Sequence, residues 1–138
     1  MNDVVYIALG SNVGNREMTL ARGRAAIANI RDTRILGESA IEETEPLGPI
    51  PQGRYLNQMI VVETAIAPPA LLAALQRIER AAGRIRSMRW GPRTLDLDIV
   101  LIEGKELMDE TLTVPHPELP NRAFWQRELH ELRGAHHG

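Results

Sequence analysis

The stretch Leu95-Asp96-Leu97-Asp98-Ile99-Val100-Leu101-Ile102 decides the fold, because it is apolar throughout except for two aspartates at alternate positions. A short apolar run of this kind is typical of a buried strand. Successive side chains of a strand point to opposite faces, so the two aspartates share one face and Leu95, Leu97 and Ile99 take the other. The stretch therefore predicts a strand that is apolar toward the core and carries two carboxylates on its second face.

Working outward from this strand, the sequence alternates between strand and helix patterns. Aliphatic and β-branched runs predict strands over 4–9 and 56–64, the second with apolar residues on both faces, and a weaker run predicts one over 35–43. Apolar residues at helical spacing predict helices over 16–30 and 68–82 and a short helix over 122–132. This order predicts an α+β fold, a split βαβ sandwich in which two helices cover one face of a mainly antiparallel sheet.

With 138 residues the chain has the length of one domain, and we expect a single domain over 1–138 that acts as a monomer. It contains no cysteine, which excludes disulfides, cysteine-ligated zinc and thiol nucleophiles. Because it also shows no leader or membrane-spanning pattern, we expect a cytoplasmic protein. Its net charge of −2 gives no overall field that would draw it to nucleic acid or membranes.

The first candidates for chemistry are Asp96 and Asp98. About 6.8 Å separates them along the strand, since each residue rises about 3.4 Å, and two carboxylates on one face repel each other unless a cation compensates them. Oxygen ligands of this kind favour Mg²⁺, which binds through one or two carboxylates together with substrate phosphates. The alternative is an edge strand whose polar face is simply solvated.

A second candidate group lies just upstream, in a stretch without acidic residues that contains Arg84, Arg86, Arg89 and Arg93. Glycine and proline in this stretch predict a loop, which leaves the guanidinium groups free to converge on an anion. Carboxylates for a metal beside arginines for phosphate indicate a polyphosphate site. The alternative is that these arginines only neutralise nearby acidic side chains.

Aromatic residues make up only 4% of the chain, and three of them fall at loop ends, where a ring can stack on a flat ligand: Tyr55, Trp90 and Phe124. Asn57 lies two residues from Tyr55 on the same strand face, and its amide offers a donor and an acceptor to the edge of a heterocycle. Packing beneath a loop is the alternative for each ring.

Gln76, Glu79 and His116 are further polar candidates. Gln76 and Glu79 are three residues apart on the second predicted helix, so they are neighbours that can hydrogen-bond a nucleotide. Taken alone, the pair is explained better by a solvated helix face. His116 lies between Pro115 and Pro117, where a histidine is more often a turn residue than a catalyst.

Sequence blocks in a fixed order connect these residues to a known family. The blocks are Ala8-Leu9-Gly10-Ser11-Asn12, Pro46-Leu47-Gly48-Pro49, Tyr55-Leu56-Asn57, Arg89-Trp90-Gly91-Pro92-Arg93-Thr94-Leu95-Asp96-Leu97-Asp98-Ile99, Leu112-Thr113-Val114-Pro115-His116-Pro117 and Asn121-Arg122-Ala123-Phe124. Together they resemble the 6-hydroxymethyl-7,8-dihydropterin pyrophosphokinase family of folate biosynthesis. The block from Arg89 to Asp98 is highly specific.

The resemblance implies a ferredoxin-like fold and transfer of pyrophosphate from ATP to the hydroxymethyl group of the dihydropterin, with release of AMP. It implies that Asp96 and Asp98 hold two Mg²⁺ ions, and we expect Arg84 and Arg93 to stabilise the leaving group. The pterin pocket that it implies consists of Thr44, Leu47, Tyr55, Asn57 and Phe124. The ATP site that it implies consists of Gln76, Glu79, Arg84, Arg86, Trp90, Arg93, Ile99, Leu112, Thr113, His116 and Arg122.

One position and one short stretch depart from the family pattern. Thr111 stands where family members can carry an arginine, so we expect one phosphate contact fewer. Arg127, Glu128 and Leu129 replace an apolar stretch that commonly follows Phe124. We expect the second change to affect stability rather than the metal pair.

Two other kinds of function remain open. A ferredoxin-like sheet with exposed aromatic residues can bind RNA, but this chain lacks an aromatic-rich sheet motif and its basic cluster is one loop rather than a face. The other alternative is a catalytically weak family member that binds pterin. We expect a small-molecule substrate and neither nucleic acid nor a membrane as partner.

Overall fold

The computed structural model of the protein describes residues 2–46, 53–83 and 94–137. Its elements follow in the order β1 (Asp3–Ser11), α1 (Arg16–Ala28), β2 (Thr33–Glu38), β3 (Glu42–Thr44), β4 (Tyr55–Thr64), α2 (Pro68–Ala81), β5 (Asp96–Ile102), β6 (Leu107–Met108), β7 (Thr113–Val114), the 3-10 helix η1 (Leu119–Asn121) and α3 (Ala123–His137). The three predicted helices and the strand that carries the two aspartates are confirmed. None of the helices in these ranges is long and apolar enough to cross a membrane.

The main sheet pairs its strands antiparallel throughout the described chain. Its order is β2-β4-β1-β5, and the short β3 also pairs with β4. The central strand β1 pairs with β4 from Asp3↔Thr64 to Ser11↔Leu56, and with β5 from Val5↔Ile102 to Gly10↔Asp96. The strand of the aspartates therefore lies at one side of this sheet.

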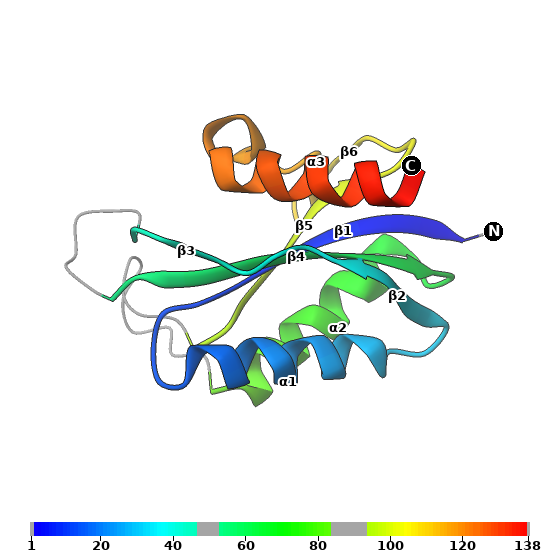
Figure 1. Ribbon diagram of the computed structural model, residues 1–138. Helices are drawn as coiled ribbons and strands as arrows, with labels where there is room; N and C mark the ends of the chain where they lie inside the picture. The colour runs from blue at the N-terminus through cyan, green and yellow to red at the C-terminus, as the bar shows by residue number, and fades with distance from the viewer. Residues whose placement is uncertain (1, 47–52, 84–93, 138) are drawn as a thin grey trace.

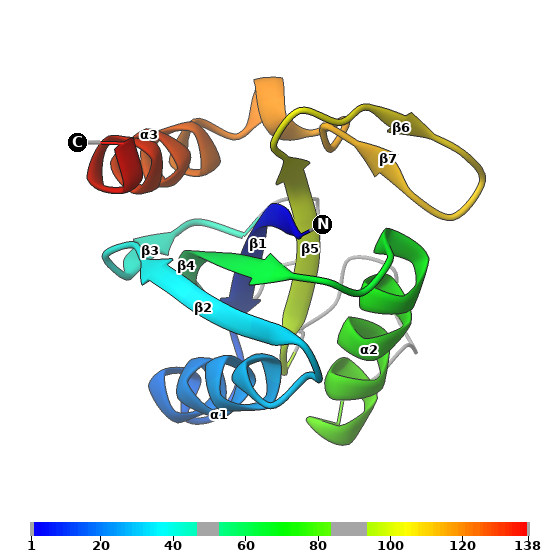
Figure 2. The same cartoon turned by 90° about the vertical axis from the view of Figure 1, so that its right-hand side faces the viewer.

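Helices cover both faces of the sheet (Figures 1 and 2). α1 and α2 lie side by side on one face, and α3 crosses the other. The core beneath α1 and α2 includes Ile60 and Leu75, whereas the core beneath α3 includes Tyr6, Met59 and Trp125. The predicted pair of helices on one face is confirmed, and α3 adds a third layer.

The weak strand expected over 35–43 is in fact two strands, because Ser39 interrupts it. The Ser39 backbone N–H donates to Met59 O at 2.9 Å, and Ser39 Oγ accepts from Met59 N at 2.9 Å, so the hydroxyl takes the place of a backbone carbonyl in the ladder. β3 then pairs with the far end of β4, from Glu42↔Asn57 to Thr44↔Tyr55. This pairing brings Thr44 next to Tyr55.

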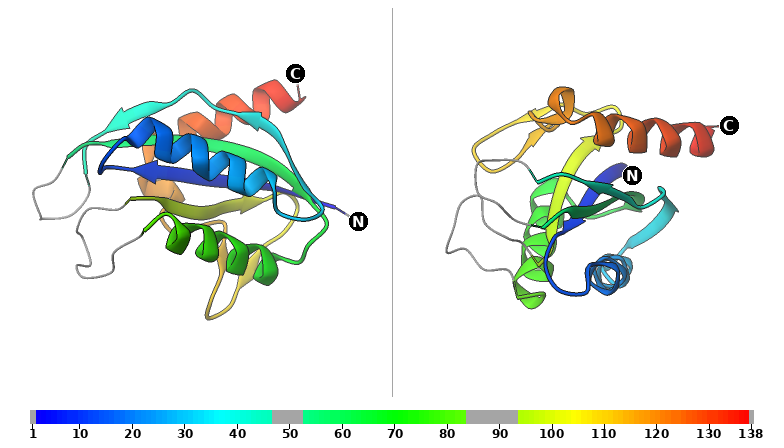
Figure 3. Two further views of the ribbon diagram at one scale, coloured as in Figure 1. Left: turned by 90° about the horizontal axis from the view of Figure 1, so that it is seen from below. Right: turned by 60° about the vertical axis from the view of Figure 1, so that its left-hand side comes forward.

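The first strand is longer than the one expected over 4–9. Gly10 and Ser11 continue β1, which ends at Ser11. Asn15 caps α1, since its Oδ1 accepts from Met18 N at 3.0 Å. Figure 3 shows that the chain on either side of 47–52 and of 84–93 lies at the same end of the sheet. The described residues that border these two stretches therefore lie at one end of the sheet.

Because β4 packs on both faces, substitutions on either face should destabilise the protein. Ile60 faces α1 and α2, Met59 faces α3, and both side chains are fully buried. We expect Ile60→Ala and Met59→Ala each to lower the free energy of unfolding by about 2–5 kcal/mol in urea denaturation, the usual cost of large-to-small core substitutions. The partly exposed Glu63→Ala is the control, within about 0.5 kcal/mol of the parent. Unchanged stability of Met59→Ala would contradict the packing of α3.

Candidate functional site

Asp96 and Asp98 lie on the face of the sheet that α3 crosses. Leu95, Leu97 and Ile99 are buried in the core beneath α1 and α2, so strand alternation puts both aspartates on the opposite face. Both aspartates are partly exposed. The expectation that the two carboxylates share one accessible face is therefore confirmed.

The neighbouring strand β1 places small residues beside these carboxylates. Gly10 pairs with Asp96 on one side and with Asn57 on the other, and Ala8 pairs with Asp98 in the same way. Strands lie about 4.8 Å apart, so Asn57 and Asp96 stand about 10 Å apart with only a glycine between them. A Cβ at Gly10 would lie 3.3 Å from Asn57 Oδ1 and 3.5 Å from Tyr55 Cδ1. Gly10 thus keeps the space between the amide and the carboxylate open.

β3 and β4 bring together Thr44, Tyr55 and Asn57, which the sequence predicts for the pterin pocket. Asn57 is 8% exposed, and its Nδ2 donates a hydrogen bond to Thr44 Oγ1. This bond fixes the amide and leaves Asn57 Oδ1 facing Gly10. Thr44 and Tyr55 are directly opposite each other across the two strands, on the face of the aspartates. Leu47, predicted for the same pocket, lies outside the described residues.

Phe124 reaches the same side of the sheet from the first turn of α3. Its ring meets Trp125 edge-on, with centroids 6.2 Å apart, and Trp125 itself is buried against the sheet. The two rings predicted to sandwich a flat ligand, Tyr55 and Phe124, therefore come from a strand and from the helix that lies over it.

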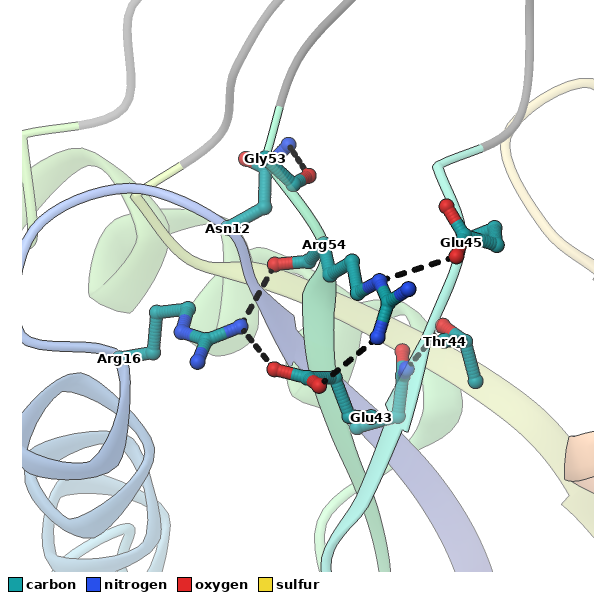
Figure 4. A network of polar contacts seen from close by, with 8 residues as sticks. Asn12, Arg16, Glu43, Thr44, Glu45, Gly53 and Arg54 are labelled. Atoms are coloured by element: carbon teal, nitrogen blue, oxygen red, sulfur yellow. Dashed lines mark hydrogen bonds and ion pairs between the residues drawn. The ribbon is translucent and has the colours of Figure 1, made fainter.

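A network of ion pairs fixes the chain on both sides of residues 47–52 (Figure 4). Arg16 Nη1 donates to Arg54 O at 2.8 Å and lies 2.9 Å from Glu43 Oε2, and Arg54 Nε lies 2.9 Å from Glu45 Oε1. The hydrogen bond from Arg16 holds the pKa of Glu43 below its usual value. The network ties the start of α1 to the adjacent ends of β3 and β4, beside the predicted pterin pocket.

His116 follows β7 and lies next to Asp98. Its backbone N–H donates to Val100 O at 2.8 Å, and its Nε2 lies 3.7 Å from Asp98 Oδ1. Because Nδ1 accepts a hydrogen bond from Glu118 N at 3.0 Å, the neutral ring carries its proton on Nε2, toward Asp98. Burial lowers the pKa of His116, with a smaller contribution from Arg122, although Asp98 and Glu118 act in the opposite direction. The ring is therefore neutral at pH 7 and does not neutralise Asp98.

Arg122 and His116 both pack against the ring of Trp125. Its Cζ lies 4.3 Å from the centroid of the Trp125 ring, and the His116 ring meets the same tryptophan edge-on at 4.9 Å. Arg122 Nε is buried and has no hydrogen-bond partner in the described part of the chain. A buried guanidinium N–H without a partner suits an anionic oxygen of a ligand.

Glu79 has a structural role that the sequence did not indicate. It is 6% exposed, and its Oε2 accepts a hydrogen bond from Leu97 N at 2.8 Å, which ties α2 to the outer edge of β5. Gln76, one turn earlier, is exposed, whereas Ile99 and Leu112 are buried and Thr113 is partly exposed. Four more residues predicted for catalysis or ATP lie outside the described residues: Arg84, Arg86, Trp90 and Arg93.

The oxygen donors of the site fit a magnesium ion that is shared with phosphates. Within residues 2–46, 53–83 and 94–137, no group of three or more histidine and acidic side chains is arranged to hold a metal. Mg²⁺ commonly keeps water and uses only one or two carboxylates when substrate phosphates complete its shell. Asp96 and Asp98 therefore fit a metal held jointly with a polyphosphate, rather than one caged by protein alone.

Sequence comparison agrees with the family that the sequence blocks resemble. A family model described as 7,8-dihydro-6-hydroxymethylpterin-pyrophosphokinase (HPPK) matches residues 6–134. The chain belongs to this family. Over 132 residues this HPPK chain is 41% identical to the 2-amino-4-hydroxy-6-hydroxymethyldihydropteridine pyrophosphokinase of Bacillus subtilis (strain 168), covering 96% of its own length and 79% of the relative. The enzyme of the same name from Pseudomonas aeruginosa is 44% identical over 129 residues, covering 93% and 79% of the two chains.

A solved structure supports the fold of this HPPK chain. The crystal structure of an HPPK-DHPS in complex with substrates matches it with a TM-score of 0.59, over 83% of this chain and 30% of the other. At 14% sequence identity this likeness concerns the fold alone. The family and the ferredoxin-like fold that the sequence blocks implied are thus confirmed.

Sequence reasoning missed two features of the site. One is that Gly10 keeps the space between Asn57 and Asp96 open, and the other is the contact between His116 and Asp98. A glycine inside a strand pattern signals a bulge or a close approach, and this signal was available for Gly10. The contact between His116 and Asp98 joins residues on different elements, and their spacing in the sequence carries no sign of it.

The bond between Glu79 and Leu97 yields a prediction about stability. Glu79→Ala leaves the buried Leu97 N–H without its acceptor, so we expect the free energy of unfolding to fall by about 1–3 kcal/mol in urea denaturation. Glu79→Gln keeps an acceptor oxygen at the same place and should retain most of the stability. An equal loss in both variants would show that the charge of Glu79, rather than this hydrogen bond, is what matters.

Proposed function

We propose that this HPPK chain carries out its reaction on the sheet face between β4, β5 and α3, with Asp96 and Asp98 as ligands of two Mg²⁺ ions. The reaction is the transfer of pyrophosphate from ATP to the hydroxymethyl group of 6-hydroxymethyl-7,8-dihydropterin in folate biosynthesis. The observation that carries the assignment is the register Asn57–Gly10–Asp96, which puts the backbone positions of an amide suited to a heterocycle and of a carboxylate about 10 Å apart. ATP is a cytoplasmic substrate, and we expect the enzyme to act there.

The proposed pterin pocket consists of Thr44, Leu47, Tyr55, Asn57 and Phe124. Its main support is the fixed amide of Asn57, whose Oδ1 faces the open position at Gly10 and can accept an N–H of the pterin. Tyr55 and Phe124 would hold the ring between them. A heterocycle that fails to pair with a buried amide is rejected strongly, by roughly 10⁴–10⁵-fold in sites of this kind.

The proposed ATP site lies at the outer side of β5, between α2 and β7. Gln76, Ile99, Leu112, Thr113, His116 and Arg122 belong to these elements and their surroundings. The support is strongest for Arg122, with its unpartnered buried Nε, and for His116, which presents an N–H beside Asp98. Glu79 aligns α2 with β5. Arg84, Arg86, Trp90 and Arg93 complete the proposed site on the strength of their sequence motif.

In the proposed mechanism the protein positions the two substrates and stabilises charge. Bound at Asp96 and Asp98, Mg²⁺ would neutralise phosphate charge and lower the proton affinity of the substrate hydroxyl. Asn57 and the two rings aim the hydroxymethyl group across Gly10 toward the aspartates, which replaces a bimolecular encounter by a fixed approach. Arg122 and the neutral His116 donate to phosphate oxygens as their charge develops. No strong protein base is required, because positioning and charge stabilisation carry phosphoryl transfer.

The alternative of RNA binding has little support from the arrangement of layers. RNA-binding sheets of this fold present aromatic side chains on an open face. Here α3 crosses the face that α1 and α2 leave uncovered, and Trp125 is only 2% exposed.

The metal assignment predicts a specific loss of activity. Asp96→Asn and Asp98→Asn should each lower kcat by about 10²–10³-fold, since a metal ion contributes several kcal/mol and each 1.4 kcal/mol is a factor of ten. AMP release from ATP and hydroxymethyl-dihydropterin, titrated with Mg²⁺, measures the loss, and circular dichroism checks the fold. Glu110→Gln, at an exposed position, is the charge-matched control. Full turnover by a folded Asp98→Asn variant would end the metal assignment.

The open position at Gly10 predicts a selective defect in pterin binding. In Gly10→Val the added side chain enters the space beside Asn57 and Tyr55, so we expect the pterin KM to rise at least about tenfold, equivalent to about 1.4 kcal/mol. The ATP KM should stay within about twofold. Gly37→Ala, whose Cβ would meet Val61 at 3.4 Å, is a control at another glycine of the sheet. Equal effects on both substrates would contradict the placement of the pterin.

A further inference from the structure

A buried carboxyl group on α3 faces a partly exposed one on β3. Glu128, on α3, is 2% exposed and faces Glu42, on β3. Both side-chain oxygens of Glu128 and Oε2 of Glu42 are buried, and in the described chain no conventional donor reaches any of the three. Burial is costly for a carboxylate without a partner. In the described chain, Glu42 Oε2 and one oxygen of Glu128 can satisfy each other only if one of the two carboxyl groups carries a proton.

Among the described residues, the charges around this pair leave Glu128 without an ion-pair partner of its own. Arg127 directs its guanidinium at Glu42, with Nε and Nη2 at 3.1 and 3.0 Å from Oε1. Glu131, also on α3, accepts a hydrogen bond from Ala40 N at 3.1 Å. On the facing strand β4, the neighbours Asn57 and Met59 do not titrate. Desolvation and the facing Glu42 raise the pKa of Glu128 to about 9, against the smaller effect of Arg127.

Both partners of the pair stand next to a wall of the proposed pterin pocket. Glu42 lies directly opposite Asn57 in the β3–β4 pairing, and Thr44 is two residues further along the same strand. Phe124 lies four residues before Glu128 on α3, about 6 Å along the helix axis. A link between Glu42 and Glu128 therefore connects the strand wall of the pocket to its helix wall.

We propose that Glu42 and Glu128 share one proton, and that this proton bridge clamps α3 onto β3 and sets the separation between the two walls of the pterin pocket. Glu128 and Glu42 are then positioning residues for the pterin, a role that rests on the function proposed above. In the bridge, the acid form of Glu128 donates its O–H to Glu42 Oε2, while Glu42 Oε1 accepts from Arg127. Such charge-assisted hydrogen bonds are among the strong ones.

Release of the proton to solvent breaks the clamp. The trio of Glu42, Arg127 and Glu128 then changes from neutral to a net charge of −1, and two carboxylates confront each other in an apolar interface. The two like charges repel, and the buried Glu128 carboxylate cannot be solvated without separating the elements. We therefore expect α3 to loosen from β3 at alkaline pH, with Phe124 moving away from Asn57.

The shared proton is tested by stability, independently of any substrate. Between about pH 5 and pH 9 the folded protein keeps a proton on Glu128 that the unfolded chain, with a carboxyl pKa near 4.5, releases. Unfolding then releases a proton, so the stability of the parent falls as the pH rises through this window. Glu128→Gln keeps a donor toward Glu42 and cannot titrate. Its Tm advantage over the parent should grow steadily from pH 5 to pH 9, and parallel Tm profiles would overturn the proton bridge.

The effect on the pocket is tested by kinetics on the same two proteins, with Glu128→Leu as the variant that cannot form the bridge. From pH 7 to pH 9.5 we expect the pterin KM of the parent to rise severalfold relative to Glu128→Gln, while the ratio of their ATP KM values stays constant. Glu128→Leu should show a raised pterin KM already at pH 7, whereas the pterin KM of Glu128→Gln should equal that of the parent at this pH. Superimposed pterin profiles of parent and Glu128→Gln would overturn the positioning role. If no variant used pterin at any pH, the proposed function would fail, whereas the Tm profiles would still decide the proton bridge.

Discussion

The pairing of β1 with both β4 and β5 is the constraint on which the site depends. Gly10 and Ala8 occupy the middle of this arrangement, where they align Asn57 and Met59 of one neighbour with Asp96 and Asp98 of the other. Because backbone hydrogen bonds fix the register, a shift by one residue would turn both aspartates into the core beneath α1 and α2. The same ladder therefore determines the hydrophobic core and the spacing between the proposed pterin and metal sites.

Local patterns in the sequence predicted most of the architecture. Alternation around Asp96 and Asp98 identified β5 and its two faces, and helical spacing identified all three helices. The exceptions are the short elements β6, β7 and η1 and the division between β2 and β3. That division depends on the hydroxyl of Ser39 in place of a backbone acceptor, and a single serine in a weak strand pattern does not reveal this. The family resemblance supplied the residues of the candidate site, whereas their mutual arrangement comes from strand register, which the sequence alone does not specify.

Contacts between distant segments account for what the sequence did not reveal. The proximity of His116 to Asp98 depends on the bond from His116 N to Val100 O, which no spacing rule anticipates. Glu128 is a different case, since it lies three residues after Trp125 and one before Leu129, within the apolar stripe of α3. That spacing predicts burial. Its acidic partner Glu42 is 86 residues away in the chain, so only the three-dimensional structure shows why burial of an acid is tolerated.

The interruption at Ser39 also bears on how these molecules behave at high concentration. A long unpaired edge strand is a template on which a strand of another chain can pair. Natural proteins avoid such templates with short edge strands and charged side chains. Here the edge of the sheet beside β4 is divided into the two short strands β2 and β3, which carry Arg34, Glu38 and Glu43. The opposite edge strand, β5, is bound to α2 by the hydrogen bond from Leu97 N to Glu79. In the described residues neither edge of the sheet presents a long, continuous unpaired strand, so the fold discourages fibrous self-association while its ligand-facing surface stays accessible.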